Sequence, residues 1–156
     1  MSYLRIISID KPKGWTSFDV VRFVKRQFQE KKVGHLGTLD PMATGVLPVF
    51  LGQATRLIPL FNNVDKTYRA ICKFGESTDT YDAEGTVTQT LDPSFLNQQE
   101  VTKAVYSFLG QQEQQTPAFS AAKVNGVPSY KLARKGLKVP VKIRPVTFHE
   151  LEVESV

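Results

Sequence analysis

Residues 34–48 read GHLGTLDPMATGVLP, and this stretch decides the fold assignment of the 156-residue chain. It surrounds one aspartate, Asp40, with Gly34, Gly37 and Gly45, and it places Pro41 directly after the aspartate. Glycine allows positive φ angles and close backbone approach, and a following proline biases a residue toward an extended backbone. The pattern predicts a loop that presents the Asp40 carboxylate. Because Asp-Pro pairs are common in turns, an ordinary turn role is the alternative.

Regular elements are expected on both sides of this glycine-rich loop, which we place at residues 33–48. Upstream, residues 3–9 are rich in β-forming side chains and predict a strand. Thr16 is a candidate helix cap with Asp19 as its capping-box partner, and apolar residues follow at the helical period up to the EKK run. Downstream, VLPVFLG predicts a buried strand and ATRLIPLF a short helix.

The second half of the chain mixes strand and helix signals. Residues 66–74 alternate like a strand, GESTDTYDAEG predicts a connection, and residues 100–109 have the period of an amphipathic helix. Asn125-Gly126 predicts a turn before a short basic helix, and a last strand changes phase near His149. Because strands and helices do not alternate in βαβ units, we expect one α+β domain with a mixed or largely antiparallel sheet and flanking helices.

The net charge of +5, from 20 basic and 15 acidic residues, is unevenly distributed. Residues 11–35 carry seven basic and two acidic side chains, and residues 123–145 carry seven basic and no acidic ones. The remaining residues carry 6 basic and 13 acidic side chains, so their net charge is −7. Such segregation fits a protein that binds a polyanion through phosphate contacts, although two solvated helical faces would give the same pattern.

Several classes of protein are disfavoured by composition. The single cysteine, Cys72, cannot form an internal disulfide and is expected to be a small buried apolar residue. Two histidines and one cysteine match no metal-site spacing, so we expect neither a metal nor a cofactor. Without an apolar run of about 20 residues or a signal peptide, the chain is expected to be a soluble, cytoplasmic monomer.

Five sequence blocks carry a resemblance to a known family. They are DKPKGWTSFDVV (10–21), VGHLGTLDPMATGVLPVFLGQATRL (33–57), DKTYRA (65–70), TDTYDAEG (78–85) and PAFSAAKVNGVPSYKLARKG (117–136). In this order they resemble the TruB family of bacterial tRNA pseudouridine synthases. The resemblance implies a pseudouridine synthase-like catalytic domain that isomerises uridine 55 in the T loop of tRNA, with Asp40 as the nucleophile.

The resemblance also implies roles for further residues. His35 would contact the flipped-out nucleotide, Tyr68 would stack on the target base, and Asp82 matches an acidic position near the active site. Gly37 would belong to the substrate-binding loop. Each has an ordinary alternative: a local hydrogen bond for His35, core packing for Tyr68 and a turn role for Asp82.

Lys11, Lys13 and the basic residues from Lys123 to Lys135 are candidate phosphate contacts, because basic residues beside a pocket suit the recognition of a folded RNA loop. The chemistry itself needs no cofactor. A carboxylate can attack either C6 of the base or C1′ of the ribose, and the sequence leaves both routes open. The enzyme must hold the detached uracil while the base turns and C5 bonds to the sugar.

The resemblance implies that residues 1–156 are a truncated catalytic domain. Family members continue into further strands, which carry an arginine that pairs with the nucleophile, and often into a small RNA-binding domain. We therefore expect weak activity or none from these residues alone. Three alternatives stay open: a non-catalytic RNA-binding or RNA-folding fragment, a guide-RNA-dependent dyskerin-like protein, and a hydrolase that pairs Asp40 with Asp79 or Asp82.

Overall fold

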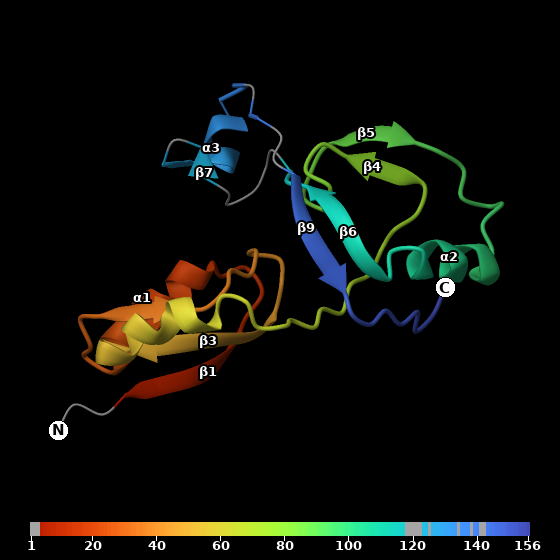
Figure 1. Ribbon diagram of the computed structural model, residues 1–156. Helices are drawn as coiled ribbons and strands as arrows, with labels where there is room; N and C mark the ends of the chain where they lie inside the picture. Colours follow the sequence, from red (N-terminus) through yellow and green to blue (C-terminus); the bar gives the residue numbers. More distant parts are fainter. Residues whose placement is uncertain (1–3, 118–122, 125, 134, 138, 141–142) are drawn as a thin grey trace. The chain divides into compact units, whose positions relative to one another are not determined.

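A computed structural model describes residues 4–117, 123–124, 126–133, 135–137, 139–140 and 143–156. The chain forms two compact units, Met1–Arg69 and Ala70–Val156 (Figure 1). The glycine-rich loop with Asp40 belongs to the first unit. Asn125, the first residue of the predicted Asn125-Gly126 turn, lies outside the described residues.

The first unit is a three-stranded antiparallel sheet with one α-helix and one 3₁₀ helix. Its elements are β1 (Arg5–Lys11), α1 (Ser17–Gln27), β2 (Val33–His35), β3 (Gly45–Leu51) and the 3₁₀ helix η1 (Gly52–Phe61). The strand order is β1-β3-β2. Lys11 pairs with Gly45 and His35 pairs with Val49, so the end of β1 and the end of β2 both lie beside the strand that follows the Asp40 loop.

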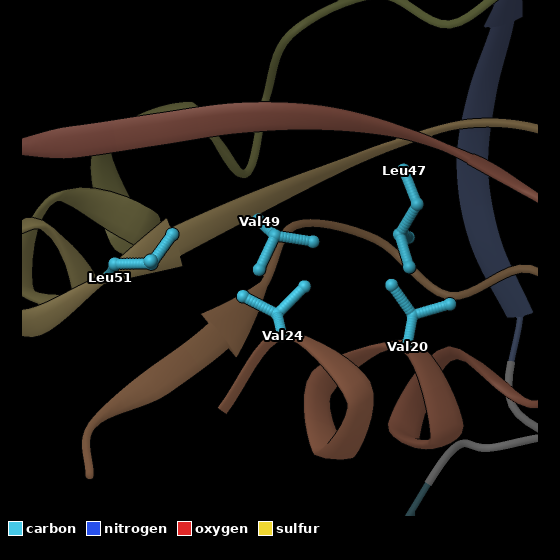
Figure 2. Packing of buried hydrophobic residues seen from close by; sticks show 5 residues of the cluster. All are labelled: Val20, Val24, Leu47, Val49 and Leu51. Carbon is cyan, nitrogen blue, oxygen red and sulfur yellow. The ribbon is translucent and has the colours of Figure 1, made fainter. Parts of the chain in front are cut away.

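The core of this unit lies between α1 and β3 (Figure 2). Val20 and Val24 of α1 pack against three alternate residues of β3, which are Leu47, Val49 and Leu51. All five side chains are buried. Successive strand residues point to opposite faces, and Val46, next to Leu47, is accordingly 69% exposed. Each fully buried aliphatic side chain contributes about 1.5–3 kcal/mol. This packing fixes the two elements that flank the loop.

The start of α1 follows the predicted capping box. The Thr16 hydroxyl accepts a hydrogen bond from the Asp19 amide at 3.1 Å, and the Asp19 carboxylate accepts one from the Thr16 amide at 2.8 Å. Two amide groups at the helix start, which have no partner within the helix, are thereby satisfied. The predicted helix start is confirmed, and so are the buried strand β3 and the short helix η1.

The described residues of the second unit form strand pairs and two short helices. Its elements are β4 (Glu76–Thr78), β5 (Val87–Thr90), α2 (Gln98–Tyr106), β6 (Gly110–Gln115), β7 (Lys123–Val124), β8 (Val127–Pro128), α3 (Ser129–Ala133) and β9 (Ile143–Phe148). The described strands pair antiparallel as β4-β5, β6-β9 and β7-β8. The predicted α+β class with antiparallel pairing is confirmed. The last strand ends at Phe148, where the sequence changes phase.

Four local predictions are wrong. Residues 66–74 form no strand, and Ile71 is fully exposed; a strand requires a pairing partner, and the described part of the chain pairs none with this segment. Cys72 in the same segment is exposed instead of buried. Finally, the expected connection after Phe74 contains β4, and the expected loop at residue 33 begins with β2, because both segments find antiparallel partners.

Candidate active site

Asp40 lies in the loop between β2 and β3. The loop is closed at its start by a hydrogen bond from the Leu36 amide to the Pro48 carbonyl, 2.9 Å, and the Ala43 amide donates to the Asp40 carbonyl at 3.0 Å. Asp40 itself is exposed. Within the described residues its carboxylate makes no hydrogen bond or ion pair. The loop therefore holds the backbone of Asp40 in a turn and leaves the acid group open to a reactant.

Lys11 supports this loop from inside the protein. Its side chain is 0% exposed, and its ammonium group donates hydrogen bonds to the carbonyls of Pro12, Trp15 and Pro41 at 3.1, 2.6 and 3.4 Å. A buried charge requires such partners, because burial without them is costly. The expectation that Lys11 contacts a phosphate does not fit this structure, because the ammonium group is buried and satisfied by backbone oxygens.

Ser17 supports the same loop from the first turn of α1. Its hydroxyl accepts a hydrogen bond from the Leu39 amide at 3.0 Å and donates one to the Leu39 carbonyl at 3.1 Å. The Gly14 amide donates to the Pro41 carbonyl at 2.7 Å. Sequence reasoning missed this role of Ser17, which it read only as part of a helix start. The two partners are 22 residues apart, and no local pattern marks such a contact.

His35 and Gly37 lie on the β2 side of the loop. His35 is half-buried, and its Nδ1 hydrogen-bonds to the carbonyl oxygen of Gly37. Because a carbonyl only accepts, Nδ1 carries a proton and donates it in this contact. Gly37 has φ +74°, a left-handed conformation that suits glycine. The alternative of a local hydrogen bond for His35 is thus observed, and its contact with a nucleotide stays a prediction.

Tyr68 follows η1 in an extended segment that belongs to no strand. Its side chain is 69% exposed, so the alternative of core packing is wrong. An exposed aromatic ring is available for stacking on a base, which is the role that the resemblance implies. That role stays a prediction.

Asp82 and Lys123 belong to the second unit. The Asp82 carboxylate accepts hydrogen bonds from the Thr80 hydroxyl at 2.7 Å and the Glu84 amide at 2.9 Å, which is the turn role left open as its alternative. Asp79, the other acid of the hydrolase alternative, accepts from the Thr86 amide at 2.8 Å. Lys123 is the first residue of β7 and pairs with Pro128.

Cavities lie elsewhere on the two units. One of about 440 Å³ is lined by Trp15, Asp19, Arg22, Phe23 and Arg26, and one of about 280 Å³ lies between residues 73 and 96. Neither is lined by a predicted site residue. Among the described residues, no cluster of three His, Cys, Asp or Glu side chains is suited to a metal ion. In the same part of the chain, no helix has the length and apolar character to cross a membrane.

Comparison with known proteins finds one family that matches most of the chain. Residues 25–156 match the family described as "TruB family pseudouridylate synthase (N terminal domain)", a region that includes Asp40, Tyr68 and Asp82. The class is therefore that of the pseudouridylate synthases. The chain belongs to the TruB family.

The curated relatives agree with this assignment. The tRNA pseudouridine synthase B of Syntrophotalea carbinolica is 46% identical over 151 residues, which cover 97% of this chain and 49% of that protein. The Clostridium tetani enzyme of the same name is 46% identical over 97% of this chain and 52% of its own length. That of Geotalea uraniireducens is 48% identical over 96% of this chain and 48% of its own length. The chain spans about half the length of these relatives.

A solved structure supports the fold. A chain in the crystal structure of a Cbf5–Nop10–Gar1 complex superposes with a TM-score of 0.57 and 24% identity. The match covers 96% of this chain and 36% of that one. This likeness concerns the α+β fold alone.

Proposed function

We propose that this chain is part of the catalytic domain of a tRNA pseudouridine synthase that converts uridine 55 of the T loop, with Asp40 as its nucleophile. One observation carries the proposal: Asp40 occupies a backbone-fixed loop with its carboxylate exposed, in a chain 46% identical to tRNA pseudouridine synthase B over 97% of its length. The T stem-loop of tRNA would be the partner.

The proposed reaction is an isomerisation that balances without a cofactor. The bond between N1 of uracil and C1′ of the ribose breaks, the base turns in the site, and C5 bonds to C1′. C5 then loses its proton, and N1 gains one. Asp40 would form a covalent adduct that divides the reaction into easier steps. The ring of Tyr68 is exposed, and we propose that it stacks on the flipped-out base, which would hold the detached uracil in the site.

The test is tritium release from tRNA transcript labelled at C5 of uridine. The enzyme is the complete product of the gene that encodes these residues, together with its Asp40→Asn variant. We expect release by the wild type and a loss of at least about 10³-fold in the variant, because removal of a covalent nucleophile removes the catalysed route. Asp92→Asn is the matched control: this exposed turn aspartate bonds Ser94 in the second unit and should leave release unchanged.

Each alternative gives its own outcome in this assay. The non-catalytic RNA-binding alternative would be favoured if the wild type released no tritium and the Asp40→Asn variant bound tRNA as well as the wild type. Release that requires an added guide RNA would favour the dyskerin-like alternative. Release of free base from the polynucleotide would favour a hydrolase. We also propose that the protein acts as a cytoplasmic monomer, which light scattering and cell fractionation test.

A further inference from the structure

The two residues that flank Asp40, Leu39 and Pro41, are both held by one segment of the chain. On the N-terminal side, the Leu39 amide and carbonyl both bond to the Ser17 hydroxyl, at 3.0 and 3.1 Å. On the C-terminal side, the Pro41 carbonyl accepts from the Gly14 amide at 2.7 Å and from Lys11 at 3.4 Å. All of these partners lie in residues 11–17, from the last residue of β1 to the first residue of α1.

The Ser17 contact is shielded from water. The residue is 3% exposed, and Leu39 packs against the apolar core that α1 forms with β3. A hydrogen bond in such a place is costly to lose, because the unpaired Leu39 groups cannot readily turn to solvent. Ser17 is also the first residue of α1, whose Val20 and Val24 are fully buried in that core. The hydroxyl therefore connects the Asp40 loop to the buried core of the unit.

The Asp40 carboxylate has the opposite environment, since it is exposed and lacks any partner within the described part of the chain. Its direction is thus set by the backbone on either side instead of by a bond to the carboxylate. A nucleophile must lie within a narrow range of positions, and a displacement of about 1 Å can cost about 10²-fold in rate. The Ser17 hydroxyl, which fixes the amide and carbonyl of the neighbouring Leu39, can therefore affect the reaction rate without touching the substrate.

We propose that Ser17 is a positioning residue for Asp40: its hydroxyl holds both polar groups of Leu39 and thereby aims the carboxylate. The inference rests on the proposed function and deepens it. Loss of the hydroxyl should lower kcat by about 10- to 100-fold while KM changes less than about twofold, because substrate contacts remain and only the reacting group is displaced.

The experiment compares Ser17→Ala, Ser17→Thr and Ser17→Cys in the complete gene product. The first removes the hydroxyl and the second retains it. Cysteine keeps nearly the same volume with a weak donor, so it tests the inference if alanine prevents folding. Ser107→Ala is the matched control, because that exposed hydroxyl donates to a backbone carbonyl, Ala104, at 2.7 Å in the second unit. The measurements are kcat and KM by tritium release, and exchange of the Leu39 amide hydrogen by NMR.

We expect faster Leu39 exchange and a lower kcat in Ser17→Ala and Ser17→Cys, substantial recovery in Ser17→Thr, and neither change in Ser107→Ala. A wild-type kcat in Ser17→Ala, or a fall that matches only its loss of folded protein, would overturn the inference. The exchange measurement needs no turnover. If the wild type proves inactive, unchanged Leu39 exchange in the variants still overturns the inference, whereas faster exchange supports it and the missing turnover counts against the proposed function alone.

Discussion

The ammonium group of Lys11 donates a hydrogen bond to the carbonyl oxygen of Pro41, thirty residues further along the chain and directly after Asp40. The same group bonds two more carbonyls, those of Pro12 and Trp15, and it is completely buried. A lysine that the sequence suggests as a surface contact for RNA is thus a support beneath the candidate nucleophile's loop.

This relationship predicts that Lys11→Met destabilises the protein without changing how RNA binding depends on salt. The carbonyls of Pro12, Trp15 and Pro41 each lose the hydrogen bond from the ammonium group, at a cost of about 1–3 kcal/mol. The chain has a single tryptophan, Trp15, in the first unit, so urea unfolding followed by its fluorescence measures this loss where it occurs.

Lys13→Met is the matched control for the RNA measurement. Lys13 is exposed two residues away, and removal of an exposed phosphate contact lowers the slope of log K against log salt by about 1. A comparable drop in the slope for Lys11→Met, measured on folded protein, would show that Lys11 reaches the RNA after all.

The core between α1 and β3 predicts a strong contrast between two neighbouring residues. Leu47 is buried against Val20 and Val24, whereas Val46 is 69% exposed on the opposite face. Leu47→Ala should cost about 2–5 kcal/mol through lost burial and a cavity. Val46→Ala should change stability by less than about 0.5 kcal/mol. Equal losses of unfolding free energy in the two variants, measured by urea unfolding, would contradict the burial of Leu47 and the exposure of Val46.

The elements that sequence predicted well are those with local signals. The capping box of Thr16 and Asp19 marks the start of α1, and the apolar run of residues 46–52 marks β3. Residues 66–74 show how such signals fail: their alternation is that of a strand, but no described segment pairs with them. A strand depends on a partner that its own sequence does not specify.

The candidate site divides in the same way. Asp40 and the glycine loop follow from the sequence, because glycine and proline restrict the backbone locally. The contacts of Lys11 with Pro41 and of Ser17 with Leu39 join residues 30 and 22 positions apart, so they follow only from the packed structure. Resemblance supplied the candidate roles of residues such as Tyr68, and the structure supplied the supports of the loop.

Gly37 predicts a test of the loop's backbone. With φ +74° it occupies the left-handed region, and an added Cβ would meet no atom within 4 Å. Gly37→Ala should therefore cost about 1–2 kcal/mol from backbone strain alone. Gly37→Asn should cost less, because asparagine tolerates this conformation better than alanine does. Trp15 fluorescence during urea unfolding checks both, and a larger loss for asparagine would contradict a purely conformational cost.

The capping box predicts a specific response to acid. Hydrogen bonds from the Thr16 hydroxyl and amide, followed by the contact with Arg22, lower the pKa of Asp19 from 3.8 to about 2. A carboxylate whose pKa is lower in the folded state stabilises that state when charged. This contribution is complete above the unfolded pKa, near 3.8, and is lost as pH falls through about 2. Asp19→Asn removes it.

The urea midpoint of Asp19→Asn should accordingly lie below that of the wild type at pH 7, and the difference should shrink between pH 4 and pH 2, the range set by the two pKa values. Val46→Ala provides the control, because it changes no titrating group and its difference from the wild type should not vary with pH in this way. The other carboxylates of the chain titrate in both proteins, so the difference between the two midpoints isolates Asp19. A gap that stays constant down to pH 2 would show that the charge of Asp19 contributes nothing to the helix start and that only its shape does.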